Sequence, residues 1–141
     1  PYNRLCRAAW WASHNDIPYI ATNPDWVCPT DEQTILVDCG SLCKAIEGST
    51  KRKPDVVIGK PNPNMLWCIR DKYGLRDDEI AMVGDRIYTD VATAQNAGSF
   101  GVLVLSGETT LDMSLTYERQ PDLTAASIKE LGELLKEASG H

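Results

Sequence analysis

Residues 80–90 read IAMVGDRIYTD, and this stretch decides the fold class. The short apolar run from Ile80 to Val83 predicts a buried strand, which ends in Gly84 and Asp85. Residues 89–97 predict a helix that stops at Gly98. A strand followed at once by a helix is half of a βαβ unit, so a parallel sheet is expected here.

The alternation of predicted strands and helices continues on both sides of this stretch. Further strands are predicted at 56–58 and 100–105, and further helices at 64–73 and 127–138. Strands that alternate with helices form right-handed βαβ units. We therefore predict an α/β fold of the Rossmann-like kind, with a parallel sheet and helices on both faces.

The first fifty residues are less regular. Residues 3–14 predict a helix, residues 17–22 form an apolar run rich in strand formers, and residues 41–47 predict a helix that ends near Gly48. Residues 35–37 are too few for an assignment. We divide the chain into an irregular segment, 1–50, and a regular α/β segment, 51–141.

The composition narrows the class of protein and its partners. The 141 residues are 43% hydrophobic and 24% charged, as in ordinary globular proteins. The net charge of -6, without a basic stripe, argues against nucleic acid as a partner. No apolar run reaches the ~20 residues of a membrane-spanning helix. Five cysteines without a disulfide-framework spacing suit a reducing compartment, so we expect a cytoplasmic protein.

One pair of cysteines has a helical spacing. Cys39 and Cys43 are four residues apart, which can place both on one face of the helix predicted at 41–47. A zinc site needs two such pairs or additional histidines. The sequence offers no such pattern, so small buried thiols are the favoured interpretation.

Three charged side chains follow the predicted strand ends. Lys60 and Asp85 each come after a strand and a glycine, and Asp90 lies at the start of the next helix. Ligands of open parallel sheets bind at the carboxyl ends of the strands. Mg²⁺ is held by one or two carboxylates together with substrate phosphate, and an ammonium group offsets phosphoryl charge. Any one of the three could be a solvated or capping residue, but their joint occurrence predicts a phosphate-plus-magnesium site.

Other phosphate-binding motifs do not fit. A Walker loop requires a glycine where Pro54 stands and a Ser or Thr where Pro61 stands. The chain contains no G-x-G-x-x-G sequence. A phospho-receiver domain would place its acidic cluster before its lysine, whereas here the lysine comes first.

The motifs resemble those of one known superfamily. Residues 59–63 (GKPNP), 83–90 (VGDRIYTD) and 104–107 (VLSG) closely resemble the haloacid dehalogenase (HAD) superfamily. The match is to the branch with a C2-type cap, which contains NagD-like and 4-nitrophenyl phosphatases, phosphoglycolate phosphatase and pyridoxal phosphatase. Residues 22–25 (TNPD) and 40–42 (GSL) are similar to the end of that cap. The resemblance implies that 1–50 is the last part of the cap and 51–141 the last part of the hydrolase core.

The resemblance also implies roles for single residues. Lys60 would contact the phosphate, Asp85 would bind Mg²⁺, and Asp90 would orient the waters of the metal and the lysine. Cys28 falls at a cap position where pyridoxal phosphatases carry a substrate-contacting histidine, so it departs from their pattern. The implied activity is Mg²⁺-dependent hydrolysis of a small phosphorylated metabolite.

The nucleophile of that superfamily is missing from the sequence. Its phosphatases attack phosphorus with an aspartate of a D-x-D motif, and none occurs among the 141 residues. Asp38 follows an apolar run but lacks the second acid, and we interpret it as a decoy. The chain resembles a C-terminal half, so we expect it to be inactive alone. Either it was processed or cut from a longer protein, or it is a degenerate, non-catalytic binding or assembly module.

The missing segment also has a structural consequence. It would include the strand that flanks 80–83 in the superfamily, and without it that strand has an open edge. We therefore expect a homo-oligomer or an association with the missing N-terminal half.

Overall fold

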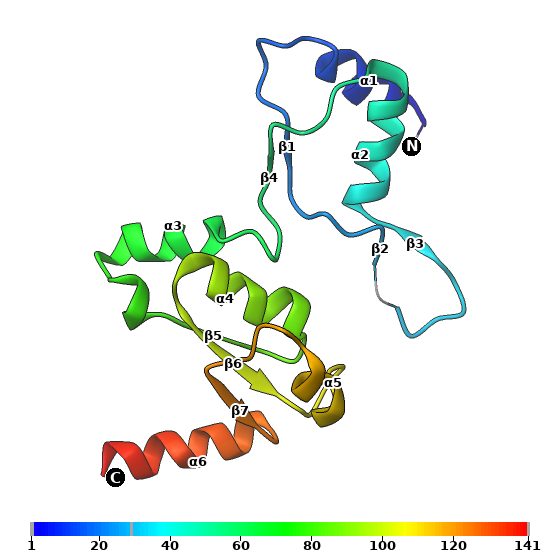
Figure 1. The fold of residues 1–141 in the computed structure, drawn as a ribbon. Coiled ribbons are helices and arrows are strands. Elements are labelled where there is room, and N and C mark those ends of the chain that lie inside the picture. Colours follow the sequence, from blue (N-terminus) through cyan, green and yellow to red (C-terminus); the bar gives the residue numbers. More distant parts are fainter. Residues whose placement is uncertain (1, 29, 141) are drawn as a thin grey trace. The chain divides into compact units, whose positions relative to one another are not determined.

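The computed structural model describes residues 2–28 and 30–140, and the chain forms two compact units (Figure 1). The first unit is Pro1–Gly59 and the second is Lys60–His141. Contacts thus divide the chain nine residues later than the predicted boundary after residue 50. The reason is that residues 56 and 57 pair with a strand of the first unit. The assignment of the two segments to a cap and a core stays a prediction.

Within its described residues, the first unit contains two helices and two short two-stranded sheets (Figure 1). Its elements are α1 (Tyr2–Ala12), β1 (Ile20–Ala21), β2 (Val27–Cys28), β3 (Leu36–Val37), α2 (Cys39–Thr50) and β4 (Val56–Val57). Strands β1 and β4 are parallel, while β2 and β3 are antiparallel. α1 packs against α2, and the buried apolar residues among those described in this unit are Ala12, Ala21 and Ile46.

Helix α2 continues past its predicted end. It begins after Asp38, whose carboxylate accepts a hydrogen bond of 2.6 Å from the Cys39 N–H. It ends at Thr50 rather than near Gly48, because Lys51 adopts a left-handed conformation and its N–H bonds the Glu47 carbonyl. Gly48 therefore lies inside the helix.

The second unit is an α/β structure around a three-stranded sheet. Its elements are α3 (Asn64–Tyr73), the short 3₁₀ turn η1 (Asp77–Glu79), β5 (Ala81–Gly84), the π-helical turn η2 (Ile87–Val91), α4 (Ala92–Ala97), β6 (Phe100–Val104), α5 (Leu111–Thr116), β7 (Leu123–Ala125) and α6 (Ile128–Ser139). The strands lie in the order β5-β6-β7 and all pairs are parallel. This confirms the predicted fold class.

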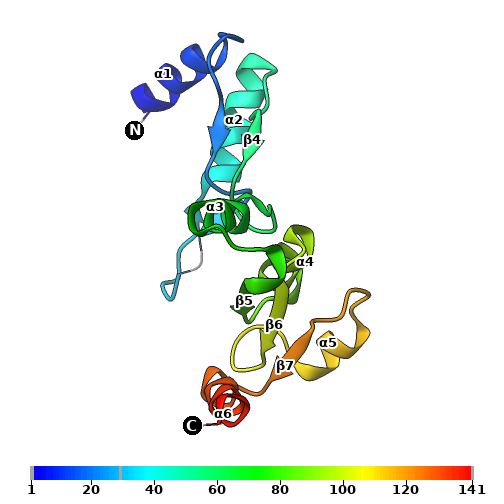
Figure 2. The ribbon, with the colours of Figure 1, turned by 90° about the vertical axis from the view of Figure 1, so that its left-hand side faces the viewer.

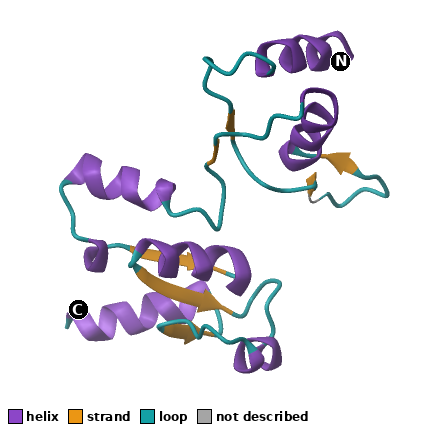
Figure 3. Cartoon of the chain, turned by 45° about the horizontal axis from the view of Figure 1, so that its top comes forward, coloured by secondary structure: helices purple, strands orange, loops and turns teal. Residues whose placement is uncertain are grey.

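Helices cover both faces of this sheet, as predicted. Neighbouring residues of β6 point in opposite directions. Val102 packs with Leu131 of α6, whereas Leu103 packs with Val91 of η2. Figures 2 and 3 show α4 and α6 on opposite sides of the strands. The core of the second unit is therefore double-sided.

Three details differ from the sequence prediction. Residues 56–58 do not join the sheet of β5, because β4 pairs with β1 in the first unit. β7 was not predicted, since three residues give no periodic signal. α5 was not predicted either, because it lies in a polar stretch; the Thr110 side chain caps its start.

One edge of the three-stranded sheet is open. Within the described residues, β5 pairs with β6 alone. Two residues of this edge strand, Ala81 and Val83, are exposed, and Val83 retains 37% of its accessible surface. The predicted unpaired edge at 80–83 is thus present in the structure. Among the same described residues, no helix is both long and apolar enough to span a membrane.

Candidate active site

A buried carboxylate lies at the carboxyl end of β5. Asp90 is only 4% exposed, and it lies on the π-helical turn η2, a type of turn found frequently at functional sites. Its Oδ1 forms an ion pair of 2.6 Å with the Nζ of Lys60. Lys60 keeps 43% of its side chain in contact with solvent. The pair therefore combines a fixed acid with a lysine that can reach a ligand.

The second oxygen of Asp90 is also engaged. Asp90 Oδ2 accepts a hydrogen bond of 3.2 Å from the backbone N–H of Arg86. Gly84 allows this arrangement, because a Cβ at residue 84 would lie 2.3 Å from the Cβ and Cγ of Asp90. The glycine before Asp85 thus makes room for the acid of η2, a reason that the sequence pattern did not reveal.

Gly59 has a corresponding role in the first unit. A Cβ at residue 59 would lie 2.5 Å from the Cα of Asn23. The glycine that precedes Lys60 is therefore required by close packing of the backbone. Neither glycine of the two motifs serves only to make a sharp turn.

Asp85 is held from the opposite side by the loop after β6. Its Oδ2 accepts a hydrogen bond of 2.8 Å from the Glu108 N–H, and its carbonyl accepts one of 3.0 Å from the Thr109 N–H. A Cβ at Gly107 would lie 2.1 Å from Asp85 Oδ2. The backbone of residues 107–109 therefore fixes the orientation of this carboxylate.

Side chains clamp the same loop in place. Arg86 Nε lies 2.5 Å from Glu108 Oε2, and the Tyr88 hydroxyl donates a hydrogen bond to Glu108 Oε1. This hydrogen bond, together with burial, raises the pKa of Tyr88. Burial acts to lower the pKa of Arg86, but the nearby Glu108 charge raises it overall. Arg86 and Glu108 therefore form an ion pair that holds the loop after β6 beside Asp85.

The sequence analysis missed the contribution of residues 107–109. The available signal was the Gly-Glu-Thr sequence at the end of the strand predicted at 100–105, because neighbouring parallel strands end at the same sheet edge. β6 is the direct neighbour of β5, so its following loop reaches Asp85.

The two aspartates differ in their capacity to bind a cation. Both oxygens of Asp90 are engaged, by Lys60 and by the Arg86 N–H. Asp85 Oδ1 has no hydrogen bond or ion pair within the described residues. An oxygen ligand of this kind suits Mg²⁺, which takes one or two carboxylates and fills its remaining positions with water and phosphate. No cluster of three or more ligating His, Cys, Asp or Glu side chains occurs in the described part of the chain.

Comparison with models of protein families shows the family to which this chain belongs. The model of the HAD-hydrolase-like family matches residues 57–131, more than half of the chain. The chain belongs to the HAD-hydrolase-like family. The match contains Lys60, Asp85 and Asp90, the three residues of the candidate site.

Solved structures and curated proteins agree with this membership. The 4-nitrophenylphosphatase of Thermotoga maritima superposes with a TM-score of 0.82 at 43% identity, over 94% of this chain and 50% of that one. Phosphoglycolate phosphatase 1A of Arabidopsis thaliana is 40% identical over 79% of this chain and 31% of its own length. The ribonucleotide monophosphatase NagD of Escherichia coli K12 is 32% identical over 92% of this chain and 50% of its own length. This HAD-hydrolase-like chain thus spans about a third to a half of these relatives.

Two other predicted residues lie in the first unit. Cys28 is exposed in β2, opposite Leu36 of β3, and its role as a substrate contact stays a prediction. Asp38 caps α2 and also accepts a hydrogen bond of 3.3 Å from Asn23 Nδ2. Both contacts support a structural role for Asp38 in this HAD-hydrolase-like chain, rather than a role as nucleophile.

Proposed function

We propose that this chain supplies the phosphate-contacting and Mg²⁺-binding residues of a phosphomonoester hydrolase. The observation that carries the proposal is the arrangement in the second unit: Asp85 has an unengaged oxygen, and Lys60 is held by the buried Asp90. Named relatives are phosphatases, among them enzymes for 4-nitrophenyl phosphate and phosphoglycolate. We propose a small phosphorylated metabolite as the substrate class.

Each residue has a distinct part in the proposed reaction. Asp85 Oδ1 would hold the ion while the Glu108 N–H keeps Oδ2 in place. Lys60 would place its ammonium group against a phosphoryl oxygen, where a compact positive charge favours the transition state. Asp90 would orient Lys60 through the 2.6 Å ion pair. A bound Mg²⁺ would add positive charge close to the phosphoryl oxygens.

The nucleophile has to come from outside these 141 residues. They contain no D-x-D sequence, and Asp38 serves as a helix cap. We therefore propose that hydrolysis requires a polypeptide segment that carries the attacking aspartate and covers the open edge of β5. The chain alone should not hydrolyse 4-nitrophenyl phosphate above background.

A chimera provides the test. The N-terminal half of the Thermotoga maritima 4-nitrophenylphosphatase, joined to this chain, should hydrolyse 4-nitrophenyl phosphate with added Mg²⁺. Lys60→Ala should abolish turnover, whereas Lys129→Ala, at an exposed lysine of the same unit, should not change it. A folded chimera, shown by circular dichroism and gel filtration, that stays inactive in the presence of Mg²⁺ would refute the proposal.

A second candidate is a non-catalytic binding or assembly module, which the absence of a D-x-D sequence favours. The same chimera separates the two functions. Binding of inorganic phosphate that depends on Lys60, without turnover in the folded chimera, would support the binding module.

A further inference from the structure

Two thiols of the first unit lie side by side on α2. Cys39 is the first residue of the helix and Cys43 follows one turn later. Their sulfur atoms are 3.9 Å apart, and both side chains are partly buried. Residues four apart share a helix face, so the pairing follows directly from the sequence spacing.

The surroundings of Cys39 favour its thiolate. Burial raises the pKa of the Cys39 thiol, but hydrogen bonds from the backbone of Asn23 and from Thr22 outweigh burial and lower the pKa overall. The position at a helix N-terminus acts in the same direction, because the helix dipole is positive there. The thiolate is the reactive form of cysteine, so Cys39 is set up as a nucleophile.

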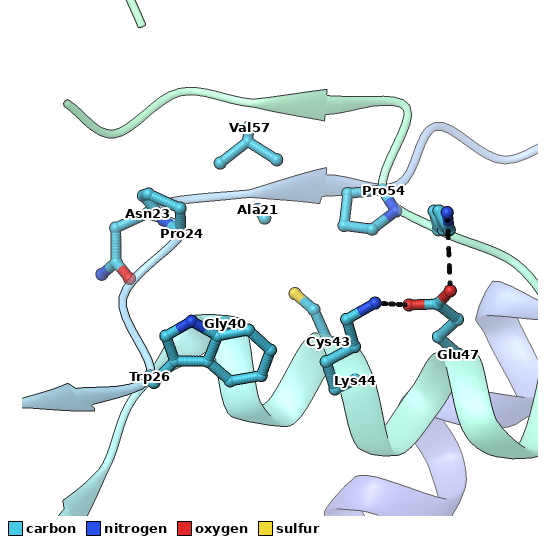
Figure 4. A pocket seen from close by; sticks show the side chains of 11 residues that line it. Ala21, Asn23, Pro24, Trp26, Gly40, Cys43, Lys44, Glu47, Pro54 and Val57 are labelled. Carbon is cyan, nitrogen blue, oxygen red and sulfur yellow. Dashed lines mark hydrogen bonds and ion pairs between the residues drawn. The ribbon is translucent and has the colours of Figure 1, made fainter. Parts of the chain in front are cut away.

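The surroundings of Cys43 favour its protonated form. Burial raises the pKa of the Cys43 thiol. Its sulfur borders a cavity of about 260 Å³ between α2 and the β1–β4 pair, whose lining includes Ala21, Trp26 and Val57 (Figure 4). The cavity lets a small reagent reach Cys43, and the Cys39 side chain, which is not part of the cavity lining, is itself only partly buried. The Cys39 thiol therefore ionises more readily than the Cys43 thiol, whose sulfur lies 3.9 Å away.

Two other cysteines lack this arrangement. Cys6 lies on α1 and Cys68 on α3, and both are exposed. Within the described residues, neither has a second cysteine sulfur within hydrogen-bonding distance. They provide internal controls for reactivity that depends only on exposure.

We propose that Cys39 and Cys43 form a site of reversible oxidation by hydroperoxides. In the first step the Cys39 thiolate attacks the peroxide oxygen, the O–O bond breaks, and Cys39 becomes a sulfenic acid while the hydroperoxide leaves as hydroxide or alkoxide. In the second step the Cys43 sulfur attacks the Cys39 sulfur, a disulfide forms, and the sulfenic oxygen leaves as water with the Cys43 proton. The two cysteines together lose two electrons and the hydroperoxide gains them.

The helix permits the disulfide but resists it. A rise of about 1.5 Å per residue sets the Cα atoms roughly 6 Å apart, inside the range of disulfides. The Cβ atoms of such a pair are about 5–6 Å apart, farther than in a relaxed disulfide, so the first turn must loosen. The first turn has no intrahelical partners for its N–H groups, so loosening there breaks few helical bonds. A strained bridge of this kind is reduced easily, which makes the modification reversible.

Loosening the first turn would affect the segment that it holds. The Gly40 N–H donates to the Asp25 carbonyl at 2.8 Å, and the Ser41 hydroxyl donates to the Trp26 carbonyl at 2.7 Å. A Cβ at Gly40 would lie 2.2 Å from the Pro24 carbonyl oxygen. Oxidation should therefore release residues 23–26, which lead into β2.

Peptide mapping of the wild-type chain tests the proposal without any variant. The 141-residue chain is treated with limiting hydrogen peroxide, alkylated and digested. We expect a Cys39–Cys43 disulfide before any oxidation of Cys6 or Cys68, and its loss on treatment with dithiothreitol. Hydrogen exchange of residues 23–26 should accelerate in the oxidised sample. Oxidation of Cys6 or Cys68 at an equal or higher rate would overturn the proposal.

Variants separate the two roles. In Cys43→Ser, dimedone should trap a sulfenic acid at Cys39, because the resolving thiol is gone. In Cys39→Ser, Cys43 should stay reduced at the same peroxide dose. Cys68→Ser is the matched control and should form the disulfide at the wild-type rate. The proposal would be refuted if dimedone labelled Cys43 in Cys39→Ser but did not label Cys39 in Cys43→Ser, because Cys43 would then be the residue that attacks the peroxide.

Discussion

Replacing Gly84 by alanine tests the geometry of the candidate site most directly. The new Cβ would lie 2.3 Å from the Cβ and Cγ of Asp90, whereas carbon atoms normally approach to about 3.5–4 Å. Asp90 cannot simply rotate away, because Lys60 and the Arg86 N–H hold its two oxygens. Either η2 moves away from β5 or Asp90 gives up a partner.

The structure sets the magnitude of this effect. Overpacking a tight site costs about 1–3 kcal/mol. Losing a hydrogen bond to a charged group costs about 1.5–3 kcal/mol. Because relief of one strain lessens the other, we expect a combined loss of about 3 kcal/mol in the free energy of unfolding of the second unit. That is a large part of the ~5–15 kcal/mol by which domains are stable.

Hydrogen exchange measured by mass spectrometry is the assay, because it resolves the second unit from the first. Peptides of β5 and β6 should exchange roughly a hundredfold faster in Gly84→Ala. The control is Gly132→Ala in α6, where a Cβ meets nothing within 4 Å and helix propensity should add about 0.5–1 kcal/mol of stability. Unchanged exchange of β5 and β6 in Gly84→Ala would refute the proposed contact between Gly84 and Asp90.

The remaining predictions concern the metal, the first unit, acid stability and assembly. In the active chimera, Asp85→Asn should abolish Mg²⁺ binding measured by calorimetry, and Asp90→Asn should weaken it about 10–100-fold. The control Asp112→Asn, at an exposed aspartate, should leave Mg²⁺ binding unchanged. Equal losses for Asp85→Asn and Asp90→Asn would contradict the assignment of Asp85 as the ligand and Asp90 as its supporting acid. Arg52→Lys should destabilise the first unit by about 2 kcal/mol, measured by hydrogen exchange. The Arg52 side chain is 11% exposed, and its guanidinium donates hydrogen bonds to the carbonyls of residues 12, 14 and 17, which a lysine cannot all replace. Unchanged protection of the first unit would show that these hydrogen bonds are unimportant. The Tyr19 N–H, with help from Arg52, lowers the pKa of Asp55 in the folded protein. The stability that Asp55 adds is therefore complete above the ordinary carboxyl pKa of about 3.9 and is lost as the pH falls through the lower pKa of the folded protein. Asp55→Asn should make the free energy of unfolding less dependent on pH in this acidic range, and an unaltered dependence would contradict the assignment. The open edge of β5 should make the chain elute from a sizing column as a dimer or larger, and a monomer with a protected β5 would contradict that expectation.

Local sequence determined the second unit well where its signals are periodic. The strand at 80–83, the strand at 100–105 and the final helix were recognisable because apolar residues recur with the period of each element. Gly74 and Gly98 mark helix ends, and both adopt the left-handed conformation. The predicted start of the last helix at residue 127 agrees with the structure, where Ser127 caps α6 and its hydroxyl accepts a hydrogen bond from the Glu130 N–H.

Local sequence was insufficient where an element depends on distant partners. Residues 56–58 have the composition of a strand, but composition does not state which strand lies beside it. The pairing of β4 with β1 depends on residues 36 positions apart. β7 is defined by its pairing with β6, since three residues have no stability of their own.

For the candidate site, too, some features follow from local sequence and others depend on distant partners. The sequence by itself determined which side chains could hold phosphate and Mg²⁺, because Lys60, Asp85 and Asp90 follow strand ends in a specific motif, and it determined that no D-x-D sequence is present. Only the tertiary structure decided what each acid does. Asp90 is saturated by Lys60 and the Arg86 N–H, while Asp85 keeps one oxygen open because the loop after β6 engages the other. The physical reason is that a hydrogen bond is decided by distance and direction in space, and residues 85 and 108 meet only because β5 and β6 lie side by side in the sheet.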